Sequence, residues 1–148
     1  EYTRQHEHVT HAGVQPVPTL LVVPMPLIKI MFEDDHEHLL ALRDYVSRQP
    51  WSADYEVFFS DRTLLEVTRK GASKGAMVAR LAQRLGISPA HIYCAGDENN
   101  DLSMLTMAAE GFAPANCVET VRSCGATIVA DCDHDTLAEI VSILDKRY

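Results

Sequence analysis

Long hydrophobic runs and positive charge are both scarce in this 148-residue sequence. No apolar stretch approaches the roughly 20 residues that a membrane-spanning helix needs, and no charged-then-apolar signal segment opens the chain, so we expect no membrane partner and a cytoplasmic location. Lysine and arginine number 13 against 21 aspartate and glutamate residues, which gives a formal net charge of −8. Because nucleic acids and anionic membranes attract basic surfaces, this balance argues against both as partners.

Paired cysteines and a glycine-rich phosphate loop are also missing. The four cysteines contain no C-x-x-C pair, which argues against a zinc ribbon and a redox dithiol, and we expect free thiols. No G-x-x-x-x-G-K-[ST] segment is present, which weighs against a phosphate- or nucleotide-binding domain without hydrolysis. Hydrophobic residues nevertheless make up 47% of the chain, enough for the core of one ordinary domain or two small ones.

The N-terminal part of the chain divides into a polar arm and an α+β portion. Residues 1–15 are polar without a period, and we interpret them as an arm or linker. The histidines His6, His8 and His11 lie there, and we read them as part of a solvated tail because a flexible segment lacks the supporting hydrogen bonds of metal ligands. Residues 16–70 predict a partial α+β cap domain. Its expected elements are strands over 17–23 and 27–32, a helix over 36–48, and an antiparallel hairpin of 55–60 with 63–69.

From Gly71 onward the pattern changes to alternating helices and strands, which is typical of parallel βαβ units. Ser73 is expected to cap the first helix, which stops at Gly86. The later strands are expected at 91–95, 111–114 and 126–130, and the later helices at 99–109, 116–124 and 133–146. The fold class predicted for residues 71–148 is therefore α/β, with a parallel sheet.

Two local patterns in this second portion carry chemistry. Asp97 follows an apolar strand, and Asp101 lies four residues later, near it on the first turn of a helix. Carboxylates at the carboxyl end of a parallel strand suit Mg²⁺. Lys74 lies in the first turn of another helix, where free N–H groups and an ammonium group together form a phosphate site. Alone, the first pattern also fits a solvated capping loop and the second a surface lysine, but both together favour a metal-and-phosphate site.

These two segments carry a family resemblance. Gly71-Ala72-Ser73-Lys74-Gly75, followed by Gly96-Asp97-x-x-Asn100-Asp101-Leu102-Ser103-Met104-Leu105, resembles the haloacid dehalogenase superfamily, in particular the Cof-type sugar phosphatases with an α/β cap. The resemblance implies a partial Rossmann-like core, with helices on both faces of the sheet, over 71–148, preceded by part of the cap. It also implies a Mg²⁺-dependent phosphohydrolase of small phosphorylated metabolites such as sugar phosphates, acting through an aspartyl-phosphate.

The resemblance assigns roles to four residues. Asp97 is implied as a magnesium ligand, and Asp101 as a residue that either coordinates the metal or supports it indirectly. Asn100 is implied as a hydrogen-bond donor to the transferring phosphoryl group, and Lys74 as the cation that neutralises it. The substrate partner implied is a small phosphorylated molecule.

The sequence departs from the family in one large respect. The family's nucleophile lies in a D-x-D-x-T motif after the first core strand, and no such segment precedes Gly71. We therefore expect no catalytic nucleophile in this chain, which resembles a C-terminal portion of the family, and we expect the chain alone to be inactive. The alternative is a non-catalytic truncated subunit or interaction module. An exposed sheet edge beside the strand at 91–95 would then favour a dimer or pairing with the missing N-terminal half.

One segment imitates the missing motif. Residues 128–136 form an apolar strand followed by Asp131-Cys132-Asp133-His134-Asp135-Thr136, which superficially resembles D-x-D-x-T in permuted order. We interpret it instead as an acidic turn into the last helix, with Asp133 at the N-cap.

Overall fold

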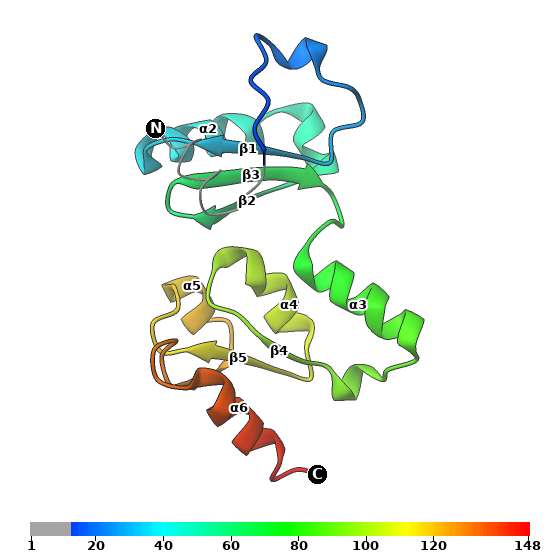
Figure 1. Ribbon diagram of the computed structural model, residues 1–148, viewed down its shortest axis with the longest axis vertical. Coiled ribbons are helices and arrows are strands. Elements are labelled where there is room, and N and C mark those ends of the chain that lie inside the picture. The colour runs from blue at the N-terminus through cyan, green and yellow to red at the C-terminus, as the bar shows by residue number, and fades with distance from the viewer. Residues whose placement is uncertain (1–12) are drawn as a thin grey trace. The chain divides into compact units, whose positions relative to one another are not determined.

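The computed structural model describes residues 13–148. Most of the predicted polar arm, with its three histidines, lies outside the described residues. The chain divides into two compact units, one ending at Arg69 and the other running from Lys70 to Tyr148 (Figure 1). No helix among the described residues is both long and apolar enough to cross a membrane.

The first unit is a three-stranded antiparallel sheet with a helix on one face (Figure 1). Its strands lie in the order β1-β3-β2. The elements are β1 (Lys29–Glu33), α2 (His36–Ser47), β2 (Tyr55–Asp61) and β3 (Leu64–Arg69), with 3-10 helices η1 (Leu20–Val22) and η2 (Pro50–Asp54). Leu39 of α2 packs against Phe59 and Leu65 of the sheet and forms its core. The predicted helix and hairpin are confirmed, with small shifts at their ends.

The strand predicted over 17–23 is wrong. The segment contains only η1, and its Leu21 side chain is 93% exposed. Prolines 16, 18, 24 and 26 explain the failure, because each lacks the N–H group that a sheet ladder requires. Within residues 13–148, the β-favouring side chains between these prolines pair with no strand and belong to no buried core cluster.

The second unit is a three-stranded parallel sheet in the order β4-β5-β6. Its helices are α3 (Lys74–Leu85), α4 (Leu102–Met107), α5 (Glu119–Arg122) and α6 (Thr136–Leu144), with 3-10 helices η3 (Pro89–His91) and η4 (Asn99–Asp101). Its strands are β4 (Tyr93–Ala95), β5 (Glu110–Pro114) and β6 (Thr127–Val129). This is the predicted α/β architecture with a parallel sheet.

Helices cover both faces of the parallel sheet (Figure 1). Successive strand residues point to opposite faces. Ala113 of β5 therefore joins a core with residues of α3, α4 and α5, whereas its neighbour Phe112 packs with Val129 of β6 and Ile140 of α6. Phe112 and Val121 are completely buried. This two-sided burial holds the carboxyl ends of β4 and β5 in fixed positions.

Two predicted helix starts are wrong. The helix expected at Asn116 begins only at Glu119, with Val118 at the N-cap, because the Asn116 amide bonds to Cys132 instead. The helix expected at Asp133 begins at Thr136, and its N-cap is Asp135. Asp135 adopts a left-handed conformation, with φ 58°, which separates α6 from the preceding turn.

Candidate functional site

The first part of the site is the N-terminus of α3. Ser73 is the N-cap, and its hydroxyl accepts a hydrogen bond from the N–H of Ala76 at 3.3 Å, as the sequence predicts. Gly86 ends the helix in the left-handed conformation, with φ 69°. The N–H of Gly75 donates to the Ser103 hydroxyl at 3.1 Å, which ties the start of α3 to α4. Lys74 is therefore held beside the loop that follows β4.

The second part is that loop, which is organised around the buried carboxylate of Asp101. The side chain of Asp101 is only 5% exposed. Its Oδ2 accepts hydrogen bonds from the N–H groups of Asp97 at 3.0 Å and Glu98 at 3.2 Å. Its Oδ1 accepts from Lys74 Nζ at 2.5 Å. Both oxygens of Asp101 are thus used to shape the loop and to hold Lys74.

Lys74 joins the two parts of the site. Besides its ion pair with Asp101, Nζ donates to Asn100 Oδ1 at 3.2 Å. The lysine side chain is half exposed, whereas its carboxylate partner is buried. Loss of one partner of a buried pair costs about 3–5 kcal/mol, and solvent screening of the exposed lysine reduces that cost here. Three of the four residues predicted for the site are therefore in direct contact.

Two glycines permit the close approach of these segments. A Cβ atom on Gly96 would lie 2.4 Å from the Asp101 Cβ atom, and one on Gly75 would lie 2.2 Å from the Ser103 carbonyl oxygen. Both contacts are far inside van der Waals distance, and the second is to backbone, which cannot rotate away. Glycine is needed at both positions for space rather than for an unusual φ.

Asp97, the fourth predicted residue, differs from Asp101 in having an available carboxylate. Its side chain is exposed and makes no hydrogen bond or ion pair with any residue in 13–148. Mg²⁺ usually takes one or two carboxylates together with waters and substrate phosphates. The donor set at the carboxyl end of β4 therefore fits Mg²⁺, with Asp97 as the available ligand and Asp101 already engaged by N–H groups and Lys74.

A second acidic group lies in the first unit. Asp34, Asp35 and His38, all exposed, are the one group of three potential metal-ligating side chains found close together among the described residues. The N–H of Asp35, together with His38 at 3.3 Å from Asp34 Oδ1, lowers the pKa of Asp34. The position of the group at the start of α2 and these contacts explain why the three side chains lie close together.

Sequence reasoning missed the contacts that position the loop from outside. Thr120 donates to Asn99 Oδ1 at 2.6 Å, and the N–H of Val118 donates to the carbonyl oxygen of Asp97 at 3.0 Å. Ser103 is a further such residue. These partners are separated by about 20 residues in the chain, and a single hydroxyl residue carries no signal of its distant partner.

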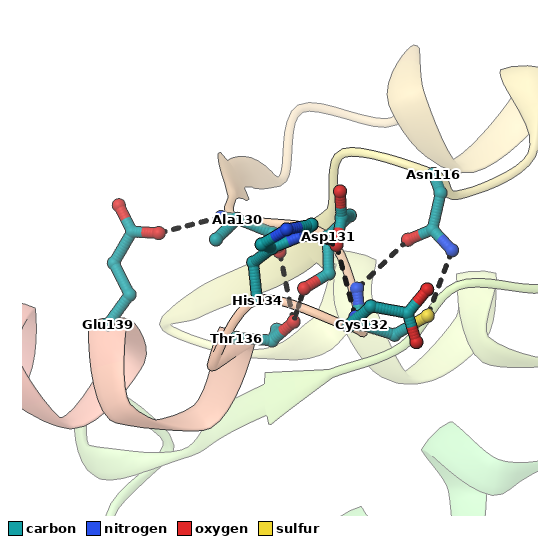
Figure 2. A network of polar contacts seen from close by, with 8 residues as sticks. Asn116, Ala130, Asp131, Cys132, His134, Thr136 and Glu139 are labelled. Carbon is teal, nitrogen blue, oxygen red and sulfur yellow. Dashed lines mark hydrogen bonds and ion pairs between the residues drawn. The ribbon is translucent and has the colours of Figure 1, made fainter.

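The acidic segment after β6 is a folded turn (Figure 2). Asp131 Oδ1 accepts the N–H of Asp133 at 3.0 Å and lies 2.5 Å from His134 Nδ1. The hydrogen bond with His134, assisted by the N–H of Asp133, lowers the pKa of Asp131. Thr136 donates to the carbonyl oxygens of Ala130 and Asp131. The Asp131 carboxylate thus makes hydrogen bonds within the turn into α6, which agrees with the predicted acidic turn. The predicted N-cap at Asp133 is wrong, because the N-cap is Asp135.

The sequence of residues 1–141 matches the family model for haloacid dehalogenase-like hydrolases. The chain belongs to this family. Among curated haloacid dehalogenase relatives it is 32% identical over 126 residues to the putative phosphatase YxeH of Bacillus subtilis, covering 82% of this chain and 45% of the relative. It is 37% identical over 90 residues to the HMP-PP phosphatase of Cronobacter sakazakii, covering 61% of this chain and 33% of that protein.

Solved structures of the family share the fold. A haloacid dehalogenase-like hydrolase from Bacteroides thetaiotaomicron superposes with a TM-score of 0.76 at 22% identity, covering 96% of this chain and 53% of that one. A HAD subclass IIB sugar phosphatase superposes with a TM-score of 0.77 at 22% identity, covering 96% and 54%. The chain thus spans about half the length of these relatives.

Proposed function

We propose that this chain supplies the phosphate- and metal-binding part of a Mg²⁺-dependent phosphohydrolase that acts on small phosphorylated metabolites, among them sugar phosphates. The observation that carries the proposal is the contact of Lys74 with Asn100 and Asp101 at the carboxyl end of β4. Two of the relatives, a putative phosphatase and an HMP-PP phosphatase, support a small phosphorylated substrate. Phosphatases of this family generally use Mg²⁺.

The contacts of each residue support a role in binding the phosphoryl group or Mg²⁺. Lys74 presents a half-exposed ammonium group to an anionic phosphoryl group, while Asp101 holds it in place. Asn100 accepts from Lys74 through Oδ1, which leaves its amide NH₂ group to donate to a phosphoryl oxygen. Asp97 offers the carboxylate for Mg²⁺, which would neutralise charge on the phosphoryl group. Positioning and charge neutralisation are the main sources of catalysis in phosphoryl transfer.

The proposed reaction also requires a nucleophile. In the complete reaction an aspartate oxygen forms a bond to phosphorus as the bond to the leaving alcohol oxygen breaks, and water then hydrolyses the aspartyl-phosphate. Asp131 begins the segment that resembles the nucleophile motif, and its carboxylate is hydrogen-bonded to Asp133 and His134 in the turn before α6. We therefore propose that residues 1–148 alone bind phosphate without turning over phosphate esters.

Inorganic phosphate, titrated into the ¹⁵N-labelled chain in the presence of Mg²⁺, tests this assignment. We expect amide shift changes centred on Gly75, Asp97 and Asn100, and at least a tenfold weaker response in Lys74→Met, because the cation is lost. Lys146→Met is the matched control and should respond as the original chain does. Shift changes of equal size in both variants, or none near β4, would contradict the proposal.

A non-catalytic subunit is the second candidate function. It is favoured by the outer edge of β4, which pairs with no strand of residues 13–148, because exposed strand edges invite pairing with another chain. Such a subunit needs neither Lys74 nor Asp97 for its role. Partner binding by the original chain, without any binding of phosphate, would favour it.

A further inference from the structure

Both polar main-chain atoms of Asp97 are held, whereas its carboxylate has no partner within residues 13–148. The N–H of Asp97 donates to Asp101 Oδ2 at 3.0 Å, and the carbonyl oxygen of Asp97 accepts from the N–H of Val118 at 3.0 Å. The first contact lies within the loop after β4, but the second comes from the segment after β5. The direction of the Asp97 carboxylate therefore depends on where that segment lies.

Residues 115–120, which we call the brace, contact the loop at two points. One is the bond from the Val118 N–H to the Asp97 carbonyl oxygen. The other is the Thr120 hydroxyl, which donates to Asn99 Oδ1 at 2.6 Å. Because the two contacts reach the loop two residues apart, a shift or a tilt of the brace would move the loop with it.

The brace is itself held by apolar packing and by a local hydrogen bond. Cys117 and Val121 are buried in the core cluster on one face of the sheet. Burial of this kind is not directional. Arg122 of α5 donates to the carbonyl oxygen of Ala115, which closes the brace on its own helix. Neither interaction fixes the orientation of the brace relative to the other loops at the carboxyl ends of the strands.

Asn116 connects the brace to the turn after β6 (Figure 2). Its Nδ2 donates to Cys132 Sγ at 3.0 Å, and its Oδ1 accepts from the N–H of Cys132 at 3.2 Å. The amide thus uses both its donor and its acceptor on one partner residue. Two bonds of opposite sense between the same two residues fix an orientation as well as a distance.

The turn that carries Cys132 is a firm attachment point. The Thr136 hydroxyl donates to the carbonyl oxygens of Ala130 at 2.9 Å and Asp131 at 2.7 Å. The N–H of Ala130 donates to Glu139 Oε2 at 2.6 Å, and Figure 2 shows these bonds surrounding the turn. The turn is therefore fixed to α6, whose inner face is buried on the sheet.

We propose that Asn116 is a positioning residue for Asp97: it fixes the brace to the turn after β6, and the brace orients the loop that presents the Asp97 carboxylate to a divalent cation. The part of the proposal that concerns the cation rests on the proposed function. Loss of a direct partner of a metal ligand weakens metal binding about 10- to 100-fold. Because Asn116 acts through the brace, we expect a smaller effect, at least about threefold.

Two measurements on the ¹⁵N-labelled chain test the proposal. Mg²⁺ alone is titrated into residues 1–148 and followed at the Asp97 amide, and hydrogen exchange of the Val118 amide is measured without metal. Asn116→Leu removes both bonds to Cys132. It should bind Mg²⁺ at least about threefold more weakly and should exchange the Val118 amide faster, because the bond to the Asp97 carbonyl oxygen opens more often.

Thr127→Val is the matched control, because it removes one hydrogen bond of the same unit, from the Thr127 hydroxyl to Glu110 Oε1 at 2.8 Å. Thr127 begins β6, at the end of the sheet opposite to the site. The control should leave Mg²⁺ affinity and Val118 exchange unchanged. It therefore separates positioning from a general loss of stability, which circular dichroism and urea unfolding measure in both variants.

Cys132→Ala provides a second, independent variant. It removes the sulfur acceptor and keeps the main-chain bond to Asn116, so it should weaken Mg²⁺ binding by a smaller factor than Asn116→Leu does. Combined with Asn116→Leu it should add nothing, because the bond it removes is already absent. A full additional effect of Cys132→Ala in the double variant would overturn the proposal.

Equal Mg²⁺ affinity in Asn116→Leu and Thr127→Val, or equal exchange of the Val118 amide in these two variants, would also overturn it. Failure of the original chain to bind Mg²⁺ would contradict the proposed function instead. Val118 exchange, which needs no metal, would then decide alone: faster exchange in Asn116→Leu would support the positioning of the Asp97 loop, and unchanged exchange would overturn it.

Discussion

At the scale of single residues, two carboxylates of one loop have acquired different roles. Asp97 and Asp101 are equivalent in the sequence pattern, since both are aspartates at the start of one helix. Burial separates them: Asp101 accepts hydrogen bonds from two N–H groups and Lys74, whereas Asp97 is exposed and its carboxylate has no partner within residues 13–148. A buried carboxylate requires such partners. The motif predicted which residues gather, but only their surroundings indicate which one is available to a metal.

The acidic turn after β6 gives a prediction of pH dependence. We expect His134→Ala to raise the pKa of Asp131 toward its ordinary value of 3.8, because the hydrogen bond with His134 is the largest cause of the lowered pKa. A carboxylate with a lowered folded-state pKa stabilises the fold fully above the unfolded pKa, and this contribution is lost as the pH falls through the lower folded value. The variant should therefore lose less stability than the original chain as the pH falls from the unfolded-state pKa of Asp131 to its lowered folded-state pKa.

The measurement is a ¹³C NMR titration of the Asp131 carboxyl carbon. His91→Ala serves as the control, since His91 contacts Tyr148 and not the turn. An unchanged Asp131 titration in His134→Ala would show that the contact seen in Figure 2 is not maintained in solution.

At the scale of elements, prediction succeeded where local signals determine the structure. The serine cap and glycine stop defined α3 to within a residue, because each acts on its own helix. The strand predicted at 17–23 failed because prolines interrupt it. The helix start predicted at Asn116 failed because its amide bonds to the distant Cys132, and the one predicted at Asp133 failed because Asp135 adopts a left-handed conformation. The same limit applies to the site: Lys74 and Asn100 were predictable from their motifs, while Ser103 and Thr120 act through contacts across the fold.

The packing of α3 on α4 gives a second prediction. Gly75→Ala should lower the free energy of unfolding by about 1–3 kcal/mol, the usual cost of overpacking, because its Cβ would meet the Ser103 backbone at 2.2 Å. It should also weaken phosphate binding, since Lys74 moves with the start of α3. Urea unfolding measures the first effect and the phosphate titration the second.

Gly13→Ala is the control for this variant, because nothing lies within 4 Å of a Cβ atom at that position. Its unfolding midpoint should match that of the original chain. A Gly75→Ala variant as stable as Gly13→Ala would mean that α3 and α4 are not held together as closely as the Gly75 to Ser103 contact indicates.

At the scale of the whole molecule, the second unit combines an ordered candidate site at the carboxyl end of β4 with a strand edge that is unpaired within residues 13–148. The carboxyl ends of β4 and β5 are fixed by burial on both faces of the sheet. The outer edge of β4 pairs with no strand of residues 13–148, Met77, Leu81 and Leu85 of α3 are exposed, and the chain spans about half the length of its relatives. Fold and family follow from the sequence, whereas the absence of a nucleophile from residues 1–148 stays a prediction that hydrolysis by the chain alone tests.

The most direct measurement of the central claim is Mg²⁺-dependent hydrolysis of phosphate esters by the chain alone and by its complex with a co-expressed partner, the portion of YxeH that this chain does not match. We predict no turnover by residues 1–148 alone, and turnover by the complex that is lost in Asp97→Asn, because the metal ligand would be missing. Robust Mg²⁺-dependent hydrolysis by the chain alone, abolished by Asp131→Asn or Asp133→Asn, would contradict the account, since the acidic turn after β6 would then supply the nucleophile.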